Sequence, residues 1–218
     1  MPTRFSHSLL EKWARGWAIS REVPSPVTDQ GALRIDVNMP DQAARYLFPD
    51  ICPEIATVAS SITRPLVFIK VCAAAEAVQP LLPAHWKILE PAFMMTCQWQ
   101  QAPVAAPLPA GYTLDFTIVP GGLLVVIKSP EGDTAGNGRL IPVSDQLIFD
   151  RIMVDDNHRR KGLGTCIITA LAEKGYQMGI PNGVLVATPM GRSLYETMGW
   201  QVIRPYTSAV IPVGGNLP

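Results

Sequence analysis

A strand-like apolar segment, a glycine-rich turn and a helix-like segment follow one another directly in the last third of the chain. The strand-like segment covers residues 146–154, and the turn holds Arg159-Arg160-Lys161-Gly162-Leu163-Gly164. Apolar side chains then recur near helical spacing, at Leu163, Ile167, Leu171 and Met178. Gly179 and Pro181 follow and indicate the end of a helix. Glycine lets the backbone approach a ligand closely, and a helix N-terminus leaves its first N–H groups unpaired. The junction therefore predicts a site that binds an anion such as a phosphate.

A second strand and a second helix come next. Residues 183–187 (Gly-Val-Leu-Val-Ala) are apolar and β-prone, Thr188 suits an N-cap, and Gly199 suits the residue after a last helical turn. The predicted helix carries the run Ser193-Leu194-Tyr195-Glu196-Thr197-Met198-Gly199-Trp200.

The two segments together resemble the GNAT superfamily of acyltransferases. Arg-x-x-Gly-x-Gly at residues 159–164 is similar to the family's coenzyme A pyrophosphate loop, and Leu-Tyr followed by three residues and Gly-aromatic is similar to its second signature. The resemblance implies an α/β (α+β) fold with a mixed, mostly antiparallel sheet flanked by helices. An N-terminal helical extension would precede it here.

The resemblance also implies roles for single residues. Acetyl-CoA would be held by the loop and the strand before it, through Ile152, Met153, Val154, Arg159, Arg160, Lys161, Gly162, Leu163, Gly164 and Thr165. A backbone N–H of Met153 or Val154 would stabilise the oxyanion of the reacting thioester. Tyr195 matches the tyrosine that protonates the departing thiolate in many members. The alternative for Tyr195 is a half-buried packing residue beside an apolar helical stripe.

The sequence does not identify the general base that would take the amine proton. Many relatives place a glutamate on the strand before the second helix, but residues 184–187 (Val-Leu-Val-Ala) offer none. Asp150 is the nearest carboxylate on the adjacent strand, and by alternation it shares a face with Ile152 and Val154. Asp150 is therefore a candidate catalytic base, with an ion pair or a water chain to solvent as the alternatives. His158 is assigned to the loop.

Composition narrows the class of protein and its partners. A chain of 218 residues with 48% hydrophobic and 17% charged residues is typical of a soluble globular protein. Lys plus Arg and Asp plus Glu each number 18, so no net field favours nucleic acid or a membrane surface. Residues 1–17 lack the apolar stretch of a signal peptide, and no apolar run is long enough to span a membrane. A cytoplasmic location is expected.

The cysteines do not indicate a metal site. Cys52, Cys72, Cys97 and Cys166 have no close metal-ligand spacing and are interpreted as free thiols. A nucleophilic cysteine, with His85 or His158 as its base, is the alternative chemistry.

Residues 1–62 are predicted to form a helical, proline-rich extension. Leu9, Leu10, Trp13 and Trp17 recur at helical spacing and predict an amphipathic first helix. Prolines then divide the segment into turns and short helices, over residues 41–48 and 54–62.

Residues 63–105 are predicted to form a strand, a helix and a strand, over residues 65–71, 75–82 and 93–97. This segment is either a degenerate copy of a GNAT half or the start of the only copy. Residues 106–218 are predicted to be the acyl-CoA-binding core, and they begin with a hairpin of residues 112–119 and 123–128. The two helices that GNAT members place after their first strand are missing there, so the N-terminal hundred residues are the candidate replacement for the acceptor wall.

The function implied by the resemblance is transfer of an acyl group, most often acetyl, from coenzyme A to the amine of a small molecule or an amino acid. A protein N-acetyltransferase is the alternative within enzymes. A catalytically silent acyl-CoA-binding module is the alternative outside them, and the missing glutamate would suit it. The expected partners are a coenzyme A thioester and a small amine, with no metal, nucleic acid or membrane, and with a homodimer among the options for assembly.

Overall fold

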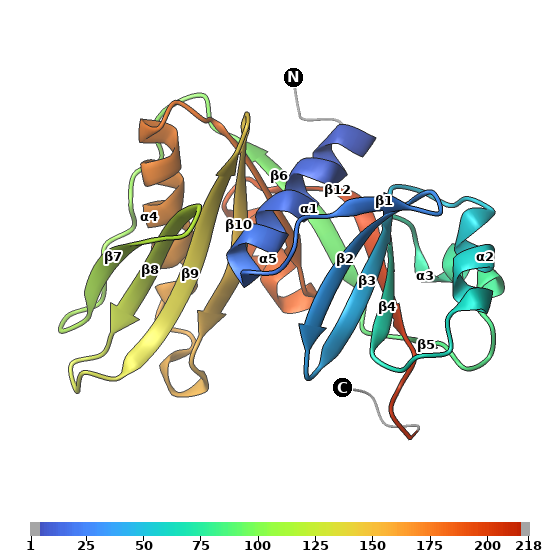
Figure 1. Ribbon diagram of the computed structural model, residues 1–218. Helices are drawn as coiled ribbons and strands as arrows, with labels where there is room; N and C mark the ends of the chain where they lie inside the picture. The colour runs from blue at the N-terminus through green and yellow to red at the C-terminus, as the bar shows by residue number, and fades with distance from the viewer. Residues whose placement is uncertain (1–4, 215–218) are drawn as a thin grey trace.

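The computed structural model describes residues 5–214, which form one large sheet with helices packed on both faces (Figure 1). Within these residues twelve strands lie in the order β1-β2-β3-β4-β12-β6-β11-β10-β9-β8-β7, and β5 pairs with β12. The strands are β1 (Val27–Asp29), β2 (Ala32–Met39), β3 (Gln42–Phe48), β4 (Val67–Val71), β5 (Lys87–Ile88), β6 (Ala92–Gln98), β7 (Thr113–Val119), β8 (Gly122–Lys128), β9 (Thr134–Val143), β10 (Gln146–Val154), β11 (Asn182–Ala187) and β12 (Gln201–Val210).

Helices connect and cover these strands. They are α1 (His7–Arg21), α2 (Glu54–Ser61), α3 (Ala75–Val78), α4 (Leu163–Gln177) and α5 (Pro189–Thr197), with short 3₁₀ turns η1 (Gln79–Leu81) and η2 (Asp156–His158). None of the helices in residues 5–214 is both long and apolar enough to cross a membrane. Of the described strand pairs, β3–β4 and β10–β11 are parallel and the others are antiparallel. The predicted mixed, mostly antiparallel sheet flanked by helices is confirmed.

The prediction that the N-terminal segment is helical is wrong between α1 and α2. Residues 41–48, predicted as a short helix, instead contain strand β3, which pairs with β2 on one side and β4 on the other. Pro40 and Asp41 form the tight turn that closes the β2–β3 hairpin, with Met39 opposite Gln42. The helix-favouring residues of β3 lie in a strand because non-local pairing and burial outweigh intrinsic propensity.

Two sets of elements repeat the same order of strand, helix, parallel strand, helix and strand. The first set is β3, α2, β4, α3 and β6, and the second is β10, α4, β11, α5 and β12. Each set contributes its last strand to the other set, because β6 pairs with β11 while β12 pairs with β4. β6 and β12 also pair with each other at the centre of the sheet. Neither set can therefore complete its part of the sheet without the other.

Helix α1 lies across the sheet between the two sets (Figure 1). The side chain of Ser6 caps its N-terminus by accepting a hydrogen bond from the Leu9 N–H. The apolar face that includes Trp13 and Trp17 is buried against side chains from both sets and from the adjoining strands β2 and β9, namely Ile35, Leu47, Ile141, Ile148 and Val184. The predicted amphipathic first helix is confirmed, and its partner is the concave side of the whole sheet.

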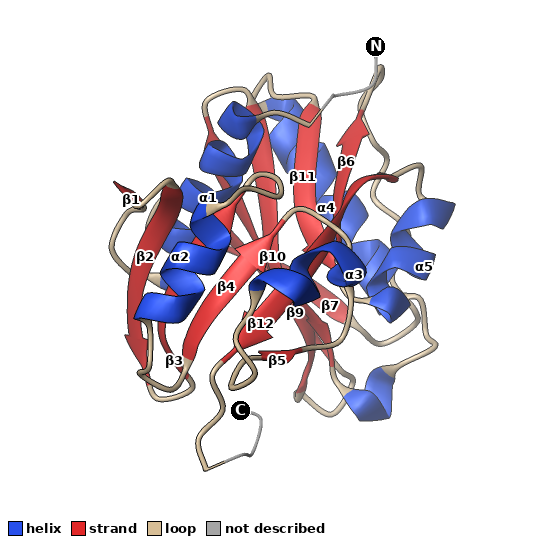
Figure 2. Ribbon diagram, turned by 90° about the vertical axis from the view of Figure 1, so that its right-hand side faces the viewer, coloured by secondary structure: helices blue, strands red, loops and turns tan. Residues whose placement is uncertain are grey.

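Helices α2 and α4 cover the opposite side of the sheet from α1. On β3, Phe48 packs with α2 while its neighbour Leu47 packs with α1. On β10, Leu147 packs with α4 while its neighbour Ile148 packs with α1. Successive strand residues point to opposite faces, so three cores result: one under α2, one under α4 and one shared core under α1. Figure 2 shows α2 and α3 lying against the strands of the first set.

We expect Gly16→Ala to destabilise the fold, because a Cβ at Gly16 would lie 2.2 Å from Cγ1 of the fully buried Ile148. The overlap forces α1 away from β10, and overpacking of this kind costs about 1 to 3 kcal/mol. Urea unfolding would measure the loss, with Ser8→Ala on the exposed face of α1 as the control. Equal stability of Gly16→Ala and the parent would contradict the close packing of α1 on β10.

Candidate active site

Strands β10 and β11 separate shortly after they begin to pair. Their parallel register covers only Leu147 with Gly183 and Ile148 with Val184. β10 then bulges between Asp150 and Met153, with Arg151 in the left-handed region at φ +54°. A bulge re-aims the strand and interrupts its pairing. The result is a cleft of about 1140 Å³ between the separated strands, bounded at one end by the loop before α4 and at the other by Arg21 of α1.

The loop before α4 presents unpaired backbone N–H groups to this cleft. Gly162 is the N-cap residue at φ +79°, and it provides no side-chain cap. The first helical bond runs from the Cys166 N–H to the Gly162 carbonyl, so the amides of residues 163–165 precede the helical ladder. These amides and the positive end of the helix dipole favour a bound anion. Arg160 adds a second left-handed residue, at φ +63°.

The structure brings together nine of the ten residues that the sequence assigns to cofactor binding. They line the cleft and are Ile152, Met153, Val154, Arg159, Arg160, Gly162, Leu163, Gly164 and Thr165. Lys161 is the exception, because its Nζ donates a hydrogen bond to the Tyr112 hydroxyl at 2.9 Å. The same hydroxyl lies 2.9 Å from Nδ1 of His158, so Tyr112 ties the loop to the end of β7. No local signal in the sequence pointed to Tyr112. Arg159 pairs with Asp156 at 2.6 Å on the exposed side of the loop.

The backbone of β10 distinguishes between the two candidate oxyanion donors. The Asp155 N–H donates to the Ala135 carbonyl, on the β9 side of the strand. Because N–H groups alternate in direction along a strand, the Val154 N–H points away from β9 and into the cleft. The Met153 N–H points back toward β9.

Tyr195 lies on α5 and lines the cleft opposite the loop. The residue is 7% exposed and its side chain belongs to the core under α4, so the packing interpretation holds for the ring. Burial raises the pKa of Tyr195 to about 12, so the hydroxyl carries its proton at neutral pH. Among residues 5–214, no hydrogen-bond partner occupies this hydroxyl. The same side chain can therefore pack and present a proton to the cleft.

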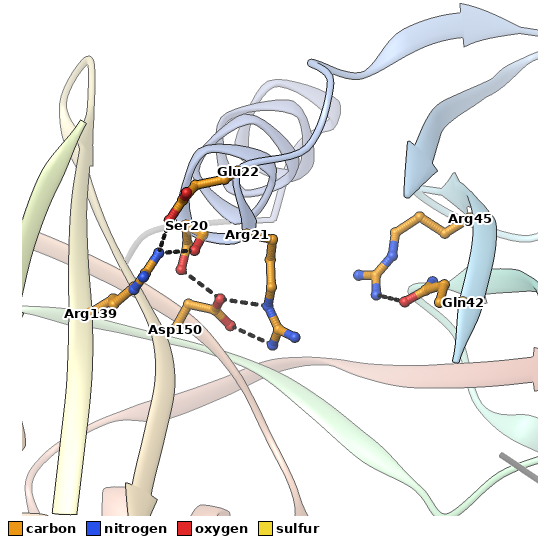
Figure 3. Close-up of polar contacts among 7 residues, drawn as sticks. All are labelled: Ser20, Arg21, Glu22, Gln42, Arg45, Arg139 and Asp150. Carbon is orange, nitrogen blue, oxygen red and sulfur yellow. Dashed lines mark hydrogen bonds and ion pairs between the residues drawn. The ribbon is translucent and has the colours of Figure 1, made fainter. Parts of the chain in front are cut away.

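Asp150 is held by the C-terminal end of α1 (Figure 3). The prediction that it shares a face with Ile152 and Val154 is wrong, because the bulge in β10 turns those two residues toward the core under α4. Oδ2 of Asp150 accepts hydrogen bonds from Ser20 Oγ at 2.8 Å and Arg21 Nε at 3.0 Å, and its Oδ1 accepts one from Arg21 Nη2 at 3.3 Å. Arg139 of β9 braces the same helix end by donating to the Ser20 carbonyl. Arg21 had no signal in the sequence, because its partner lies far along the chain.

The cysteines do not support the alternative chemistry of a nucleophilic thiol. Cys72, Cys97 and Cys166 are buried, and none of the four cysteines lines the cleft. Burial raises the pKa of Cys97 to about 11, which keeps the thiol protonated and unreactive. Within residues 5–214, no group of three or more His, Cys, Asp or Glu side chains could hold a metal ion.

The helix N-terminus with unpaired amides lies between two separating parallel strands, an arrangement that suits an anionic ligand. Residues 120–202 match the family model described as "Acetyltransferase (GNAT) domain". This match assigns the segment that contains the loop before α4 and Tyr195 to the GNAT acetyltransferase domains, a family that takes acetyl-CoA as co-substrate.

Solved structures agree with this fold across nearly the whole chain. A GCN5-related N-acetyltransferase from Kribbella flavida is similar with a TM-score of 0.64 and 12% identity, over 93% of this chain and 95% of that one. One from Sphaerobacter thermophilus has a TM-score of 0.60 and 14% identity, over 86% and 79%. A tandem GNAT protein from the clavulanic acid biosynthesis pathway has a TM-score of 0.55 and 12% identity, over 98% of each chain. No curated protein matches the sequence.

Proposed function

We propose that this protein transfers an acyl group, most simply acetyl, from coenzyme A to the amine of a small molecule or an amino acid. One observation carries the proposal: a single cleft joins the unpaired amides before α4, the Val154 N–H and the buried phenol of Tyr195. These groups are the parts that acyl transfer from a thioester requires, namely a phosphate anchor, an oxyanion donor and a proton donor.

Each part has a defined role in the proposed reaction. The amides of residues 162–165 hold the pyrophosphate, and the cleft between β10 and β11 receives the pantetheine arm. The amine nitrogen bonds to the thioester carbon. The oxyanion that forms accepts a hydrogen bond from the Val154 N–H. The carbon–sulfur bond then breaks, and the sulfur takes the proton of Tyr195. Solvent returns that proton, because a buried phenolate is unfavourable.

Asp150 is the proposed acceptor of the amine proton. It sits between Phe149 and Arg151, which both line the cleft. Three of the roughly four lone-pair positions of the carboxylate are occupied by Ser20 and Arg21, which leaves one on Oδ1 for a proton or a water. The ion pair with Arg21 equally supports a positioning role, so a test must separate the two.

We expect Asp150→Asn to lower kcat by at least about tenfold and to remove the acidic limb of the pH–rate profile, the signature of a lost general base. Affinity for acetyl-CoA should stay nearly unchanged, since Asp150 is held at the end of α1 and not by the loop before α4 that receives the pyrophosphate. Arg21→Gln is the matched control, because it breaks the ion pair and keeps the carboxylate. If Arg21→Gln also abolishes the acidic limb, or if Asp150→Asn retains it, Asp150 is not the base.

A small acceptor is favoured over a polypeptide by the position of α1. This helix packs against β9 and β10 on the side opposite α4, and we infer that it replaces the two helices that commonly form the acceptor wall in related enzymes. The C-terminal end of α1 is fixed to both strands through Asp150 and Arg139, so the acceptor end of the cleft is walled. A walled end favours a small acceptor over an extended protein segment.

The first set of elements is proposed to be a second GNAT half that has lost its cofactor site. Its order and its parallel β3–β4 pair repeat those of the second set, and similarity to a tandem GNAT protein supports a duplicated unit. The segment before α2, however, reads Pro49-Asp50-Ile51-Cys52-Pro53, with a carboxylate and no glycine. Proline lacks the N–H that a phosphate would use. We therefore expect one acyl-CoA per chain.

Calorimetry with acetyl-CoA, followed by thiol release on an amine panel, tests the proposal. One binding event per chain together with amine-dependent thiol release is the expected result. Binding without release on any amine would instead favour the catalytically silent acyl-CoA-binding module, to which the missing glutamate on β11 points.

A further inference from the structure

A buried arginine faces the α1 side of the first set and has no anionic partner. Arg45 of β3 is only 7% exposed, and no carboxylate in residues 5–214 forms an ion pair with it. Its guanidinium lies over the indole of Trp17, 3.3 Å from the ring centroid, and its Nη2 donates to Gln42 Oε1 at 2.7 Å. Its Nε is buried with no hydrogen-bond partner. Burial lowers the pKa of Arg45 to about 10, so the group remains charged at neutral pH.

The neighbours of Arg45 are donors as well. The register of β3, β4 and β12 places Arg45, Lys70 and Ser208 on the face of the sheet that α1 covers, and Tyr206 follows by alternation. The Tyr206 hydroxyl and Gln42 Nε2 are buried without partners. Lys70 Nζ donates only to the neutral Ser208 Oγ, at 2.9 Å. Burial, together with the charges of Arg45 and Arg21, lowers the pKa of Lys70.

A buried cation surrounded by unpaired donors is costly, since an isolated charge in a protein interior loses several kcal/mol of solvation. Gln42 Nε2, Arg45 Nε and the Tyr206 hydroxyl can all donate a hydrogen bond, and each lacks an acceptor. A planar anion bound at Arg45 would supply an acceptor that the cluster itself lacks. A carboxylate fits best, because its two oxygens match the fork of a guanidinium.

The cluster adjoins the acceptor end of the cleft. In Figure 3 the guanidinium of Arg45 points toward Arg21, and Arg21 stands between Arg45 and Asp150. Arg21 lines the cleft, and the charges of Arg21 and Asp150 both act on Arg45. A ligand that reaches from Asp150 to Arg45 would therefore place one end at β10 and the other at β3.

We propose that Arg45, with Gln42 and Tyr206, binds the carboxylate of the acceptor, so that the acceptor is an amine that also carries a carboxylate, of the amino-acid class. The inference rests on the proposed acyltransferase function. The amine then faces the thioester beside β10, and the carboxylate lies between α1 and β3. The first set of elements, which has no cofactor loop, thus determines which acceptor the enzyme takes.

The variant Arg45→Met tests the site, because methionine keeps an unbranched stem under Trp17 and removes the charge. Arg34→Met is the matched control: Arg34 lies on β2 opposite Tyr46, on the other face of the same sheet, in ion pairs with Asp29 and Asp36. Acceptors are glycine, β-alanine, L-phenylalanine and L-lysine, each paired with its carboxamide. Thiol release from acetyl-CoA gives kcat and KM for each member of a pair.

We expect the parent to prefer the acid over the carboxamide by at least about tenfold in kcat/KM, which corresponds to about 1.4 kcal/mol. Arg45→Met should abolish this preference mainly through a higher KM, while Arg34→Met keeps it. Arg45→Met should also melt at the same or a higher temperature than the parent, because it removes an unpaired buried charge. Equal use of acids and carboxamides by the parent, or a preference retained in Arg45→Met, would overturn the proposal.

A second readout separates failure of this site from failure of the acyltransferase function. The melting temperature is measured with the N-acetyl derivatives of the same amino acids, with their carboxamides and with inorganic phosphate, all in the presence of coenzyme A. Stabilisation by the acids alone, lost in Arg45→Met, supports the site even if no amine is acetylated. Stabilisation by phosphate alone, or by none of the probes, would show an inorganic anion or solvent at Arg45 and overturn the carboxylate assignment.

Discussion

Tyr195→Phe is expected to lower kcat about a hundredfold, the usual scale for losing one general acid, while acetyl-CoA still binds. The change deletes only the hydroxyl, which has no partner among residues 5–214, so the ring keeps its packing in the core under α4. A single-turnover assay with a confirmed acceptor measures the loss. Tyr176→Phe on α4, outside the cleft, is the matched control.

The pH dependence of the parent provides a further check on Tyr195. The hydroxyl is active in its protonated form, and burial raises its pKa to about 12. Activity should therefore not fall through ionisation of Tyr195 until the pH approaches about 12. An alkaline fall near pH 10, the ordinary range of tyrosine, that disappears in Tyr195→Phe would contradict the buried environment. Equal rates for Tyr195→Phe and the parent would reduce the residue to packing, and a large drop in melting temperature would reveal a structural hydrogen bond.

Gly162→Val is expected to weaken acetyl-CoA binding by at least tenfold, about 1.4 kcal/mol. Gly162 has φ +79°, and a Cβ there would meet no protein atom within 4 Å. The new side chain would therefore stand in open space in front of the amides that receive the pyrophosphate, and a β-branched residue would also strain the left-handed turn. Calorimetric titration with acetyl-CoA measures the effect.

Gly179→Val controls for backbone strain in this experiment. Gly179 follows the other end of α4, has φ +82° and likewise has nothing within 4 Å of a Cβ. Gly179→Val should lose about as much stability as Gly162→Val while keeping the parent's affinity for acetyl-CoA. Gly164 is less suitable, because a Cβ there would lie 2.9 Å from Cδ2 of Leu194, so its substitution disturbs the packing of α5. Equal losses of affinity in Gly162→Val and Gly179→Val would remove Gly162 from the phosphate site.

The local parts of the site could be predicted from the sequence. The strand ending at Val154, the loop at residues 159–164 and the helix after it are each determined by neighbouring residues, and the structure places them as expected. The hairpin of β7 and β8 was predictable for the same reason, since a short turn carries its own signal. Motif spacing also identified Tyr195, which lines the same cleft.

The parts that depend on distant pairing could not be predicted. Strand β3 looks helical by composition and becomes a strand only because β2 and β4 flank it. The exchange of β6 and β12 between the two sets joins segments about a hundred residues apart, and no local pattern encodes that choice. Asp150 was identified, but its partner Arg21 is 129 positions away. The residues that hold Asp150 and the burial of Arg45 therefore became visible only in three dimensions.

Acyl transfer is tested most directly by mass spectrometry of the products after incubation with isotopically labelled acetyl-CoA and the panel of amino acids and carboxamides. We expect at least one amino acid to gain a labelled acetyl group on its nitrogen, with one free thiol released per product, and we expect Tyr195→Phe and Gly162→Val to suppress this gain. Labelled acetyl-CoA that binds but remains intact with every acceptor would contradict acyl transfer, and transfer unaffected by Gly162→Val would place the reaction outside the cleft between β10 and β11.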